Sequence, residues 1–371
     1  MNVGIDRFSD QAFQEKLEEA LPFWLEEMKV PGAALAALQN GRLAYSQGFG
    51  TANVETGQPV TADTIFEAAS LSKPVVAYAV LQLVNKGLLE LDRPLLSYMP
   101  DGRIPVTLLQ GEEQSQYPPL DLPLLNQITC RHVLSHTTGF PNWPPPEAEL
   151  AIHFPSGSRF SYSGMAYAMV QTIIKVLSGQ LCQDYIQANI FDPFDMAHST
   201  FLWDGEKNWP LAVGHDKDGQ PVEKTLMRQM IAGASLHCST ADFARFLSVI
   251  LKSDADSPFH LPVELTREMT RSHIQVNNSA PWHDDWPKLG LILNKDVGWG
   301  LGWGTQQTAE SLAIWHWGDN GVYRNFVLAF PDRENGLIIM TNSKNGANLY
   351  ERILRELVGG EYPALDWLDA L

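Results

Sequence analysis

Strand patterns occupy the two ends of the chain, and mostly helical patterns fill the stretch between them. Near the start, apolar runs at 33–38 and 43–49 flank Asn40-Gly41, a pair that favours a two-residue hairpin turn. Near the end, three further strand-like runs are separated by Gly-rich and polar turns: 313–315, 325–330 and 337–341. The economical interpretation is one antiparallel sheet built from both chain ends.

Helical patterns account for most of the remaining sequence. An amphipathic helix runs from Phe13 to Met28, and a second terminal helix is expected at 349–358. Between the strand-bearing ends, helical spacing recurs in four segments: 73–86, 128–135, 165–178 and 241–252. The expected fold class is therefore α/β (α+β), with an antiparallel sheet flanked by terminal helices and an inserted, mostly helical domain.

This arrangement predicts a discontinuous domain organisation. Residues 1–66 and 290–371 are assigned to the sheet domain, and residues 67–289 to the helical domain inserted in it. Because pockets are common at domain boundaries, the active site is expected in the groove between the two parts.

Composition and charge narrow the possible partners and locations. The 371 residues include 43 Asp and Glu against 26 Lys and Arg, a formal net charge of −17. Such a surface repels phosphate backbones, so no nucleic-acid partner is expected, and no apolar run reaches the roughly 18 residues that span a bilayer. The sequence shows no signal peptide, and Cys130, Cys182 and Cys238 are far apart. We therefore expect reduced thiols in a cytoplasmic protein, with a processed secreted form left open.

The sharpest chemical signal is Ser70-Leu71-Ser72-Lys73. If a helix begins here, Ser70 and Lys73 lie on the same face, close enough for the amine to reach the hydroxyl. A serine hydroxyl becomes a nucleophile when a base takes its proton, and partial desolvation can lower the pKa of a lysine enough for it to share that task. Alone, the same pattern is also that of an ordinary helix start with a capping serine, so it needs support elsewhere.

Two downstream segments give that support. Tyr162 lies at a turn before a helix, and a phenol held near a lysine ammonium can ionise and act as a base. His316-Trp317-Gly318 lies on a C-terminal strand, where a glycine lets substrate approach the backbone amides closely. A buried core tyrosine and a strand ending in a Gly-rich turn are the structural alternatives.

Metal and nucleotide sites are not expected. His132 and His136 have the i, i+4 spacing of two ligands on a helix, but no third ligand accompanies them, which favours structural hydrogen bonding. The Gly-rich run 298–304 has no helix pattern after it, and tryptophans stand where phosphates would approach. No cofactor is therefore expected.

Taken together, the motifs resemble those of the serine β-lactamase and penicillin-binding-protein superfamily, in its class C β-lactamase-like branch, which includes carboxylesterases and D-peptidases. The resemblance covers nearly the whole chain. It is carried by six segments: 30–33, 64–73, 128–139, 160–163, 239–246 and 316–318.

The resemblance implies a role for each matching residue. Ser70 matches the acylated nucleophile, Lys73 its proton-shuttling partner and Tyr162 the tyrosine base of a Y-x-N motif. His316 and Gly318 match the first and third positions of a K-T-G motif. The backbone amides of Ser70 and Asp319 are the implied oxyanion hole.

Departures from the family pattern bear on the substrate. Gly164 stands in place of the asparagine of Y-x-N, His316 replaces a permanent lysine cation by a pH-dependent one, and Trp317 replaces a small hydroxyl residue. Trp317, Gly318 and Gly164 are thus the residues expected to contact substrate. These changes favour a neutral ester or small amide over an anionic β-lactam or D-alanyl peptide.

The predicted function is a serine hydrolase that works through an acyl-enzyme on an ester or small amide, most closely a carboxylesterase. A D-amino-acid peptidase or amidase, a weak β-lactamase, and a penicillin-binding or scaffolding protein that acylates without turnover are the alternatives. The expected partner is a small-molecule ester or amide. The oligomeric state is left open.

Overall fold

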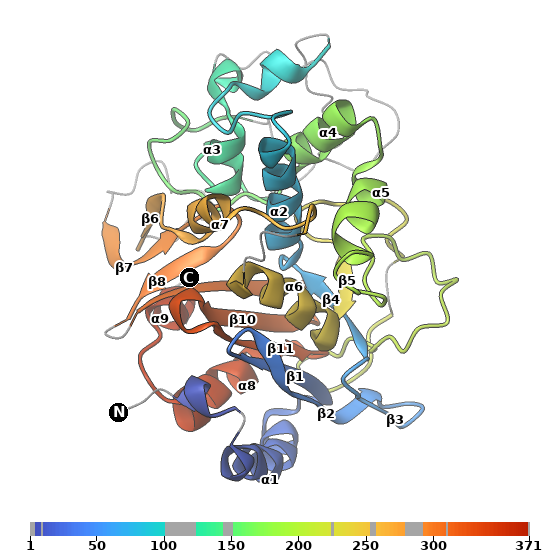
Figure 1. Ribbon diagram of the computed structural model, residues 1–371. Helices are drawn as coiled ribbons and strands as arrows, with labels where there is room; N and C mark the ends of the chain where they lie inside the picture. The colour runs from blue at the N-terminus through green and yellow to red at the C-terminus, as the bar shows by residue number, and fades with distance from the viewer. Residues whose placement is uncertain are drawn as a thin grey trace.

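The structure is a computed structural model that describes residues 4–8, 10–100, 124–143, 151–223, 226–252, 257–278, 292–308 and 311–369. Its main feature within those ranges is a nine-stranded antiparallel sheet with the order β3-β2-β1-β11-β10-β9-β8-β7-β6 (Figure 1). The strands are β1 (Gly32–Gln39), β2 (Arg42–Asn53), β3 (Gln58–Pro59), β6 (Ile274–Asn277), β7 (Leu293–Trp299), β8 (Gly304–Gln307), β9 (Leu312–Asp319), β10 (Arg324–Phe330) and β11 (Asn335–Thr341).

The two ends of the chain meet at the centre of this sheet. β1 pairs with β11 in a register that joins Ala33 to Thr341 and Leu38 to Gly336. The hairpin from β1 to β2 turns at Asn40 and Gly41, whose φ angles of 51° and 63° are those of the turn that suits the twist of paired strands. The prediction of one sheet built from both chain ends is therefore confirmed.

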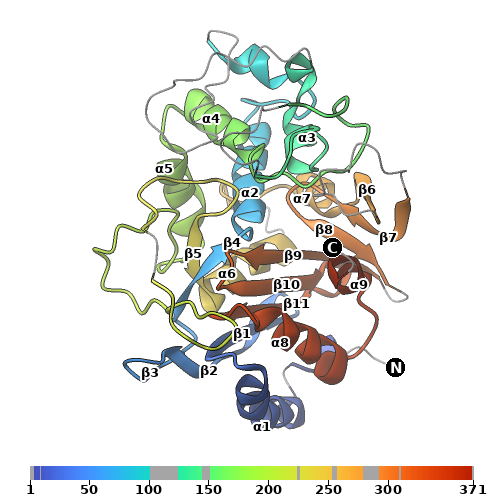
Figure 2. The ribbon, with the colours of Figure 1, turned by 180° about the vertical axis from the view of Figure 1, so that it is seen from behind.

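Both faces of the sheet are buried, because apolar side chains alternate between two cores. On β1, Ala34 and Ala36 belong to one core, and Ala33 and Leu35 to the other. Helix α6 (Thr240–Lys252) covers the first face (Figure 1). The terminal helices cover the second, as Figure 2 shows: α1 (Gln11–Met28), α8 (Gly346–Arg352) with its π-helical extension η8 (Ile353–Val358), and α9 (Pro363–Asp369). The predicted flanking helices are confirmed.

A mostly helical region stands beyond one edge of these layers. Helix α2 lies at its centre, with α3, α4 and α5 grouped around it (Figures 1 and 2). It contains a short antiparallel strand pair, β4 (Ile65–Ala69) and β5 (Leu236–Ser239). Its helical elements are α2 (Ser72–Asn85), α3 (Cys130–Leu134), α4 (Tyr167–Ser178), α5 (Cys182–Ile186), α7 (Val263–Thr270) and the π-helical turn η5 (Gln187–Phe191). Short 3₁₀ turns complete the fold: η1 (Gly4–Arg7), η2 (Leu95–Tyr98), η4 (Leu125–Gln127) and η7 (Pro331–Arg333).

The predicted domain limits fall at two different places. The limit after residue 66 lies inside β4, and the limit at 289–290 lies outside the described residues. Strand β6, which belongs to the predicted inserted region, pairs with β7 in the main sheet. The two-domain division thus stays a prediction. No helix in the described part of the chain is long and apolar enough to cross a bilayer.

Candidate active site

The serine of the SxxK motif lies in a tight turn between a strand and a helix. β4 ends at Ala69, whose φ of +52° is unusual for a residue with a side chain, and α2 begins at Ser72. Ser72 holds the turn: its Oγ donates to Ala69 O at 2.6 Å and accepts from Leu236 N at 2.9 Å. Ser70, between them, is left partly exposed with its hydroxyl free of that framework. The turn therefore engages the hydroxyl of Ser72 and leaves that of Ser70 available for contacts outside the turn.

Lys73 lies one helical turn beyond Ser70 and faces it. Its Nζ is 3.0 Å from Ser70 Oγ and donates to Gly233 O at 2.7 Å. The side chain is fully buried, and this burial holds the pKa of Lys73 well below its ordinary value. A neutral amine at this position can accept the Ser70 proton while an N–H still bonds to Gly233.

Tyr162 completes this group from the segment before α4. Its ring centroid is 4.7 Å from Lys73 Nζ, and its phenol interacts with the Ser70 side chain. Burial raises the pKa of the phenol above its ordinary value, and the interaction with Ser70 only partly opposes that rise. Sequence reasoning expected a phenol ionised by a nearby ammonium. The structure instead favours a neutral phenol beside a neutral amine, with Lys73 as the better proton acceptor.

His316 reaches the same group from β9 and is fully buried. Its Nδ1 is 2.7 Å from Trp317 O, so Nδ1 carries the proton and Nε2 is unprotonated in the neutral ring. Burial, assisted by the positive charge that Lys73 can carry, lowers the pKa of His316 to about 3. The sequence predicts that His316 is a cation that titrates near neutral pH. The structure instead indicates that the His316 ring is neutral at pH 7.

The end of β9 lies directly against β4. A Cβ added at Gly318 would lie 2.3 Å from Ala68 O and 2.9 Å from Asn325 Nδ2, so only glycine allows this approach. The space above Gly318 is thus filled by the protein's own backbone. The side chain of Asp319 is engaged in an ion pair with Arg324 and accepts from Gly321 N at 2.7 Å. The role of the Asp319 amide in an oxyanion hole stays a prediction.

Gly164 and two tryptophans form the neighbourhood of Tyr162. The indole of Trp143 fills the space that a side chain at 164 would take, with Cζ2 2.2 Å from the position of an added Cβ. Trp143 is 46% exposed, whereas Trp299, Trp303 and Trp315 are completely buried in the cores. Trp317 is half-buried, and its ring centroid lies 4.7 Å from that of Tyr162. Among these four tryptophans, counting Trp143, Trp299, Trp303 and Trp315, Trp143 is therefore the one whose side chain is exposed to solvent.

Sequence reasoning missed three residues that touch this group. Gly233 supplies the carbonyl that holds Lys73, although 160 residues separate them. Tyr167, fully buried, has its ring centroid 5.6 Å from Lys73 Nζ, and His136 has its ring centroid 4.2 Å from that of Tyr162. No local pattern marks the first two, and for His136 the sequence predicts structural hydrogen bonding without indicating a contact with Tyr162.

The two histidines of the i, i+4 pair have separate structural tasks. His132 belongs to the capping box of α3, where its Nδ1 accepts from Thr129 N at 3.3 Å. His136 lies beyond the end of that helix, in a left-handed conformation with φ +55°. Within the described ranges, no three His, Cys, Asp or Glu side chains are grouped closely enough to hold a metal ion.

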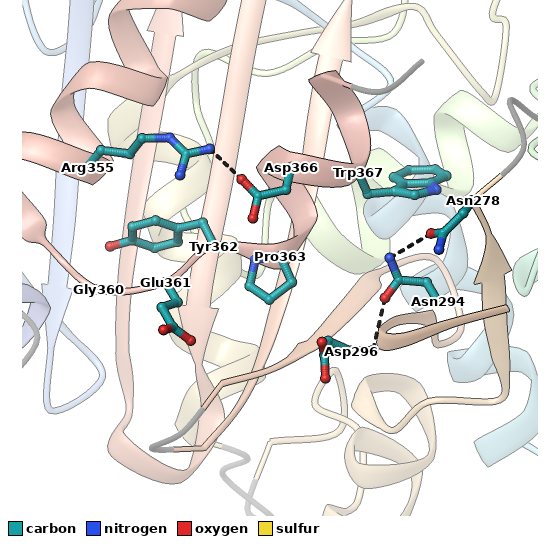
Figure 3. Close-up of a pocket in the computed structure, with 10 residues that line it drawn as sticks. All are labelled: Asn278, Asn294, Asp296, Arg355, Gly360, Glu361, Tyr362, Pro363, Asp366 and Trp367. Carbon is teal, nitrogen blue, oxygen red and sulfur yellow. Dashed lines mark hydrogen bonds and ion pairs between the residues drawn. The ribbon is translucent and has the colours of Figure 1, made fainter. Parts of the chain in front are cut away.

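A cavity of about 470 Å³ lies elsewhere, between the β7 region and the C-terminal segment (Figure 3). Polar residues line it, and many bond to one another: Arg355 pairs with Asp366 at 2.7 Å, and Asn294 with Asn278 at 2.9 Å. None of the residues around Ser70 contributes to its wall. The candidate active site is therefore identified by the contacts among Ser70, Lys73 and Tyr162.

Comparisons with known proteins identify the family and the fold of the chain. A family model described as "Beta-lactamase" matches residues 10–359. The chain is 25% identical to "Penicillin-binding protein 4" of Amycolatopsis lactamdurans over 354 residues, covering 90% of this chain and 86% of that protein. It is 37% identical to "Esterase EstB" of Burkholderia gladioli over 119 residues, or 32% and 27% of the two chains. The octameric penicillin-binding protein homologue from Pyrococcus abyssi has the same fold, with a TM-score of 0.74, 24% identity and coverage of 95% and 80%.

Proposed function

Because the chain belongs to the Beta-lactamase family, a family of serine hydrolases, we propose that it hydrolyses uncharged carboxylic esters through an acyl-enzyme on Ser70. The observation that carries the proposal is the contact of Ser70 with Lys73 and Tyr162, both of which are buried. Burial lowers the pKa of Lys73 and raises that of Tyr162, which favours the neutral form of each. A nucleophile, a proton acceptor and a second hydroxyl thus meet at one point.

Acylation begins when Ser70 Oγ attacks the ester carbonyl and Lys73 Nζ takes its proton. The backbone amides of Ser70 and Asp319 bind the oxyanion of the tetrahedral intermediate. The intermediate collapses by breaking the bond to the alkoxide, which leaves as the alcohol after taking the proton from Lys73 through the Tyr162 hydroxyl. In deacylation, Tyr162, with Lys73, takes a proton from water, and the proton returns to Ser70 as the acid is released.

The charges around Ser70 support an uncharged substrate. The position that carries a lysine in the K-T-G motif is His316, which is neutral at pH 7. Arg324, at the start of the neighbouring strand β10, is already paired with Asp319. A carboxylate on the substrate would therefore meet no ready cation at this strand, whereas an ester needs none.

The apolar surface beside the site also supports an ester as the substrate. Trp143 lies over Gly164, two residues after Tyr162, and half of its side chain is open to solvent. This indole can cover the hydrocarbon part of an acyl group. The 37% identity to the segment of Esterase EstB agrees with the same substrate class.

Hydrolysis of p-nitrophenyl butyrate, measured as release of p-nitrophenol, tests the proposal. The wild type should turn over, and Ser70→Ala should have no activity above background because the acylated oxygen is missing. Ser72→Ala is the matched control: it removes a hydroxyl of the same turn and should still form a covalent adduct with a fluorophosphonate. Normal turnover by Ser70→Ala would refute the assignment.

A second candidate is a penicillin-binding protein that acylates without turnover. It is favoured by the likeness to Penicillin-binding protein 4, which covers 90% of this chain. A benzylpenicillin adduct on Ser70 that persists for hours, with no ester turnover, would support this candidate. Rapid release of D-alanine from a D-alanyl amide would instead favour a D-peptidase.

A further inference from the structure

His136 is fully buried next to Tyr162 and belongs to a different segment of the chain. It follows the end of α3 with a φ of +55°, a left-handed conformation in which histidine, asparagine and aspartate occur more often than other residues with side chains. Such a conformation costs free energy and is kept only where surrounding contacts fix it. Several contacts of His136 involve the segment that carries Tyr162, the proposed catalytic phenol.

Two hydrogen bonds from His136 hold the residues on both sides of Tyr162. The main-chain oxygen of His136 accepts from Ser161 N at 2.7 Å, and its ring Nδ1 accepts from Ser163 N at 3.0 Å. Backbone and side chain of one residue thus fix both amides that flank Tyr162. The left-handed backbone of His136 allows the carbonyl and the ring to reach the same short segment.

The ring of His136 also contacts the phenol itself. The two ring centroids are 4.2 Å apart with an interplanar angle of 33°, and Trp299 closes the other side of the imidazole at 5.1 Å. The Tyr162 ring lies between this imidazole, Trp317 and the amine of Lys73. Its hydroxyl has little freedom to leave Ser70 while these contacts hold.

We propose that His136 is a positioning residue that holds the Tyr162 hydroxyl beside Ser70 by bonding both flanking amides and packing against the phenol ring. The inference rests on the proposed function, in which Tyr162 moves protons between Ser70, Lys73 and the leaving group. Burial, together with the positive charges that Lys73 and His316 can carry, keeps the pKa of His136 well below its ordinary value. The ring therefore stays neutral, with the proton on Nε2, and Nδ1 remains an acceptor.

The test uses two variants of the full-length chain that tolerate the backbone conformation. His136→Gly accepts a positive φ and removes both the ring and its acceptor. His136→Asn also accepts that conformation and keeps a side-chain oxygen near the position of Nδ1, so it should retain part of the function. His215→Asn is the matched control, because His215 is equally buried and lies among residues that do not contact Ser70.

The main measurement is the rate at which a fluorophosphonate labels Ser70, with kcat and KM for p-nitrophenyl butyrate as the second. Labelling forms the Ser70 Oγ–P bond, releases fluoride and needs a proton acceptor, but it does not need product release. His136→Gly should slow labelling and kcat about 10- to 100-fold, with KM changed less than about threefold, because the phenol is misplaced by a fraction of an ångström while the substrate contacts remain. His136→Asn should fall between His136→Gly and the wild type, and His215→Asn should match the wild type.

A double-mutant cycle separates positioning from general damage to the fold. If His136 acts through the Tyr162 hydroxyl, His136→Gly should slow a Tyr162→Phe chain by less than about threefold, because the group it positions is already missing. An equal loss in both backgrounds, or a His136→Gly chain as active as the wild type, would overturn the proposal.

Failure of the positioning role and failure of the proposed function give different results. Normal His136 variants together with an inactive, unlabelled Ser70→Ala chain would remove only the positioning role. A wild-type chain that is neither labelled nor active on the ester would overturn both. Turnover that persists in Ser70→Ala would overturn the proposed function directly.

Discussion

One methyl group added at Gly318 should move apart β4 and β9, the two strands that meet beside Ser70. In Gly318→Ala, the new Cβ would lie 2.3 Å from Ala68 O and 2.9 Å from Asn325 Nδ2. Ordinary van der Waals contact begins near 3.4 Å, so β4 and β9 must move apart by about 1 Å. The strands cannot give way cheaply, because Asn325 Nδ2 also donates to Glu67 O at 2.9 Å and ties β10 to β4.

This displacement acts on both groups that are proposed to bind the oxyanion. Ser70 follows Ala68 by two residues, and Asp319 follows Gly318 directly, so widening the gap moves the two amides apart. A misplacement of about 1 Å costs about 100-fold in rate, and overpacking a close contact costs about 1–3 kcal/mol of stability. We therefore expect Gly318→Ala to lower kcat about 100-fold and the free energy of unfolding by about 1–3 kcal/mol.

The assay pairs ester turnover with urea unfolding of the same preparations. Gly57→Ala is the control: Gly57 has a φ of +70° and open space where its Cβ would lie. Its replacement should cost about 1 kcal/mol through backbone strain and leave kcat unchanged. A folded Gly318→Ala chain with kcat within about threefold of the wild type would refute the idea that the approach of β9 to β4 sets the catalytic geometry.

Three further predictions concern single side chains. Lys73→Met should lower kcat about 100-fold or more, because the proton acceptor is missing. The same variant should have a higher Tm at pH 7, because the depressed pKa of Lys73 means that the unfolded wild-type chain binds a proton there that the folded chain does not. This gain in Tm should shrink as pH rises towards 10.5. His316→Gln should leave the shape of the pH–rate profile unchanged between pH 5 and 8, and a profile that changes shape would show that His316 titrates during turnover. The same variant should lose less stability than the wild type as pH falls from 6.5 towards the folded pKa of about 3, because in that range only the unfolded wild-type chain takes up a proton at His316. Trp143→Ala should lower kcat/KM for p-nitrophenyl hexanoate about tenfold relative to the acetate if the indole covers the acyl chain, and equal losses for both esters would exclude that role.

Local patterns were enough to predict the elements that carry most of the site. The turn chemistry of Asn40-Gly41 and the apolar runs at both ends predicted the sheet, because these signals depend on neighbours in sequence. The spacing of Ser70 and Lys73 predicted their contact for the same reason, since residues three apart on a helix share a face. These are short-range relations that tertiary packing preserved.

Long-range relations could not be predicted in this way. β4 is a buried run whose partner β5 begins at residue 236, and no periodicity links the two. The carbonyl of Gly233 that holds Lys73 is equally distant in sequence. The role of His136 depends on its left-handed backbone, which no pattern in the surrounding residues indicates. Each of these features is decided by which segments the fold brings together.

The electrostatics of the site depend on burial, which is itself a property of the whole fold. From the sequence, His316 is a histidine with an ordinary pKa and therefore a conditional cation at neutral pH. In the structure it is enclosed by Trp299, Trp317 and Tyr162, which offer no compensating charge and disfavour the protonated form. A lysine at this position, as in the K-T-G motif, would be charged at pH 7, whereas the buried His316 is neutral there.

That difference gives a magnitude to the preference for uncharged substrates. Protonating His316 at pH 7 to meet a substrate carboxylate would cost about 5 kcal/mol, since its pKa of about 3 lies about four units below the pH and each unit is worth about 1.4 kcal/mol. A cost of that size corresponds to more than a thousandfold in affinity. Part of it would be recovered from the attraction of the carboxylate, but a neutral ester avoids it entirely and still uses Ser70, Lys73 and Tyr162 in the same way. The proposed preference for uncharged substrates therefore follows from the buried, uncharged state of one ring on β9, while the proposed chemistry follows from the contacts of Ser70.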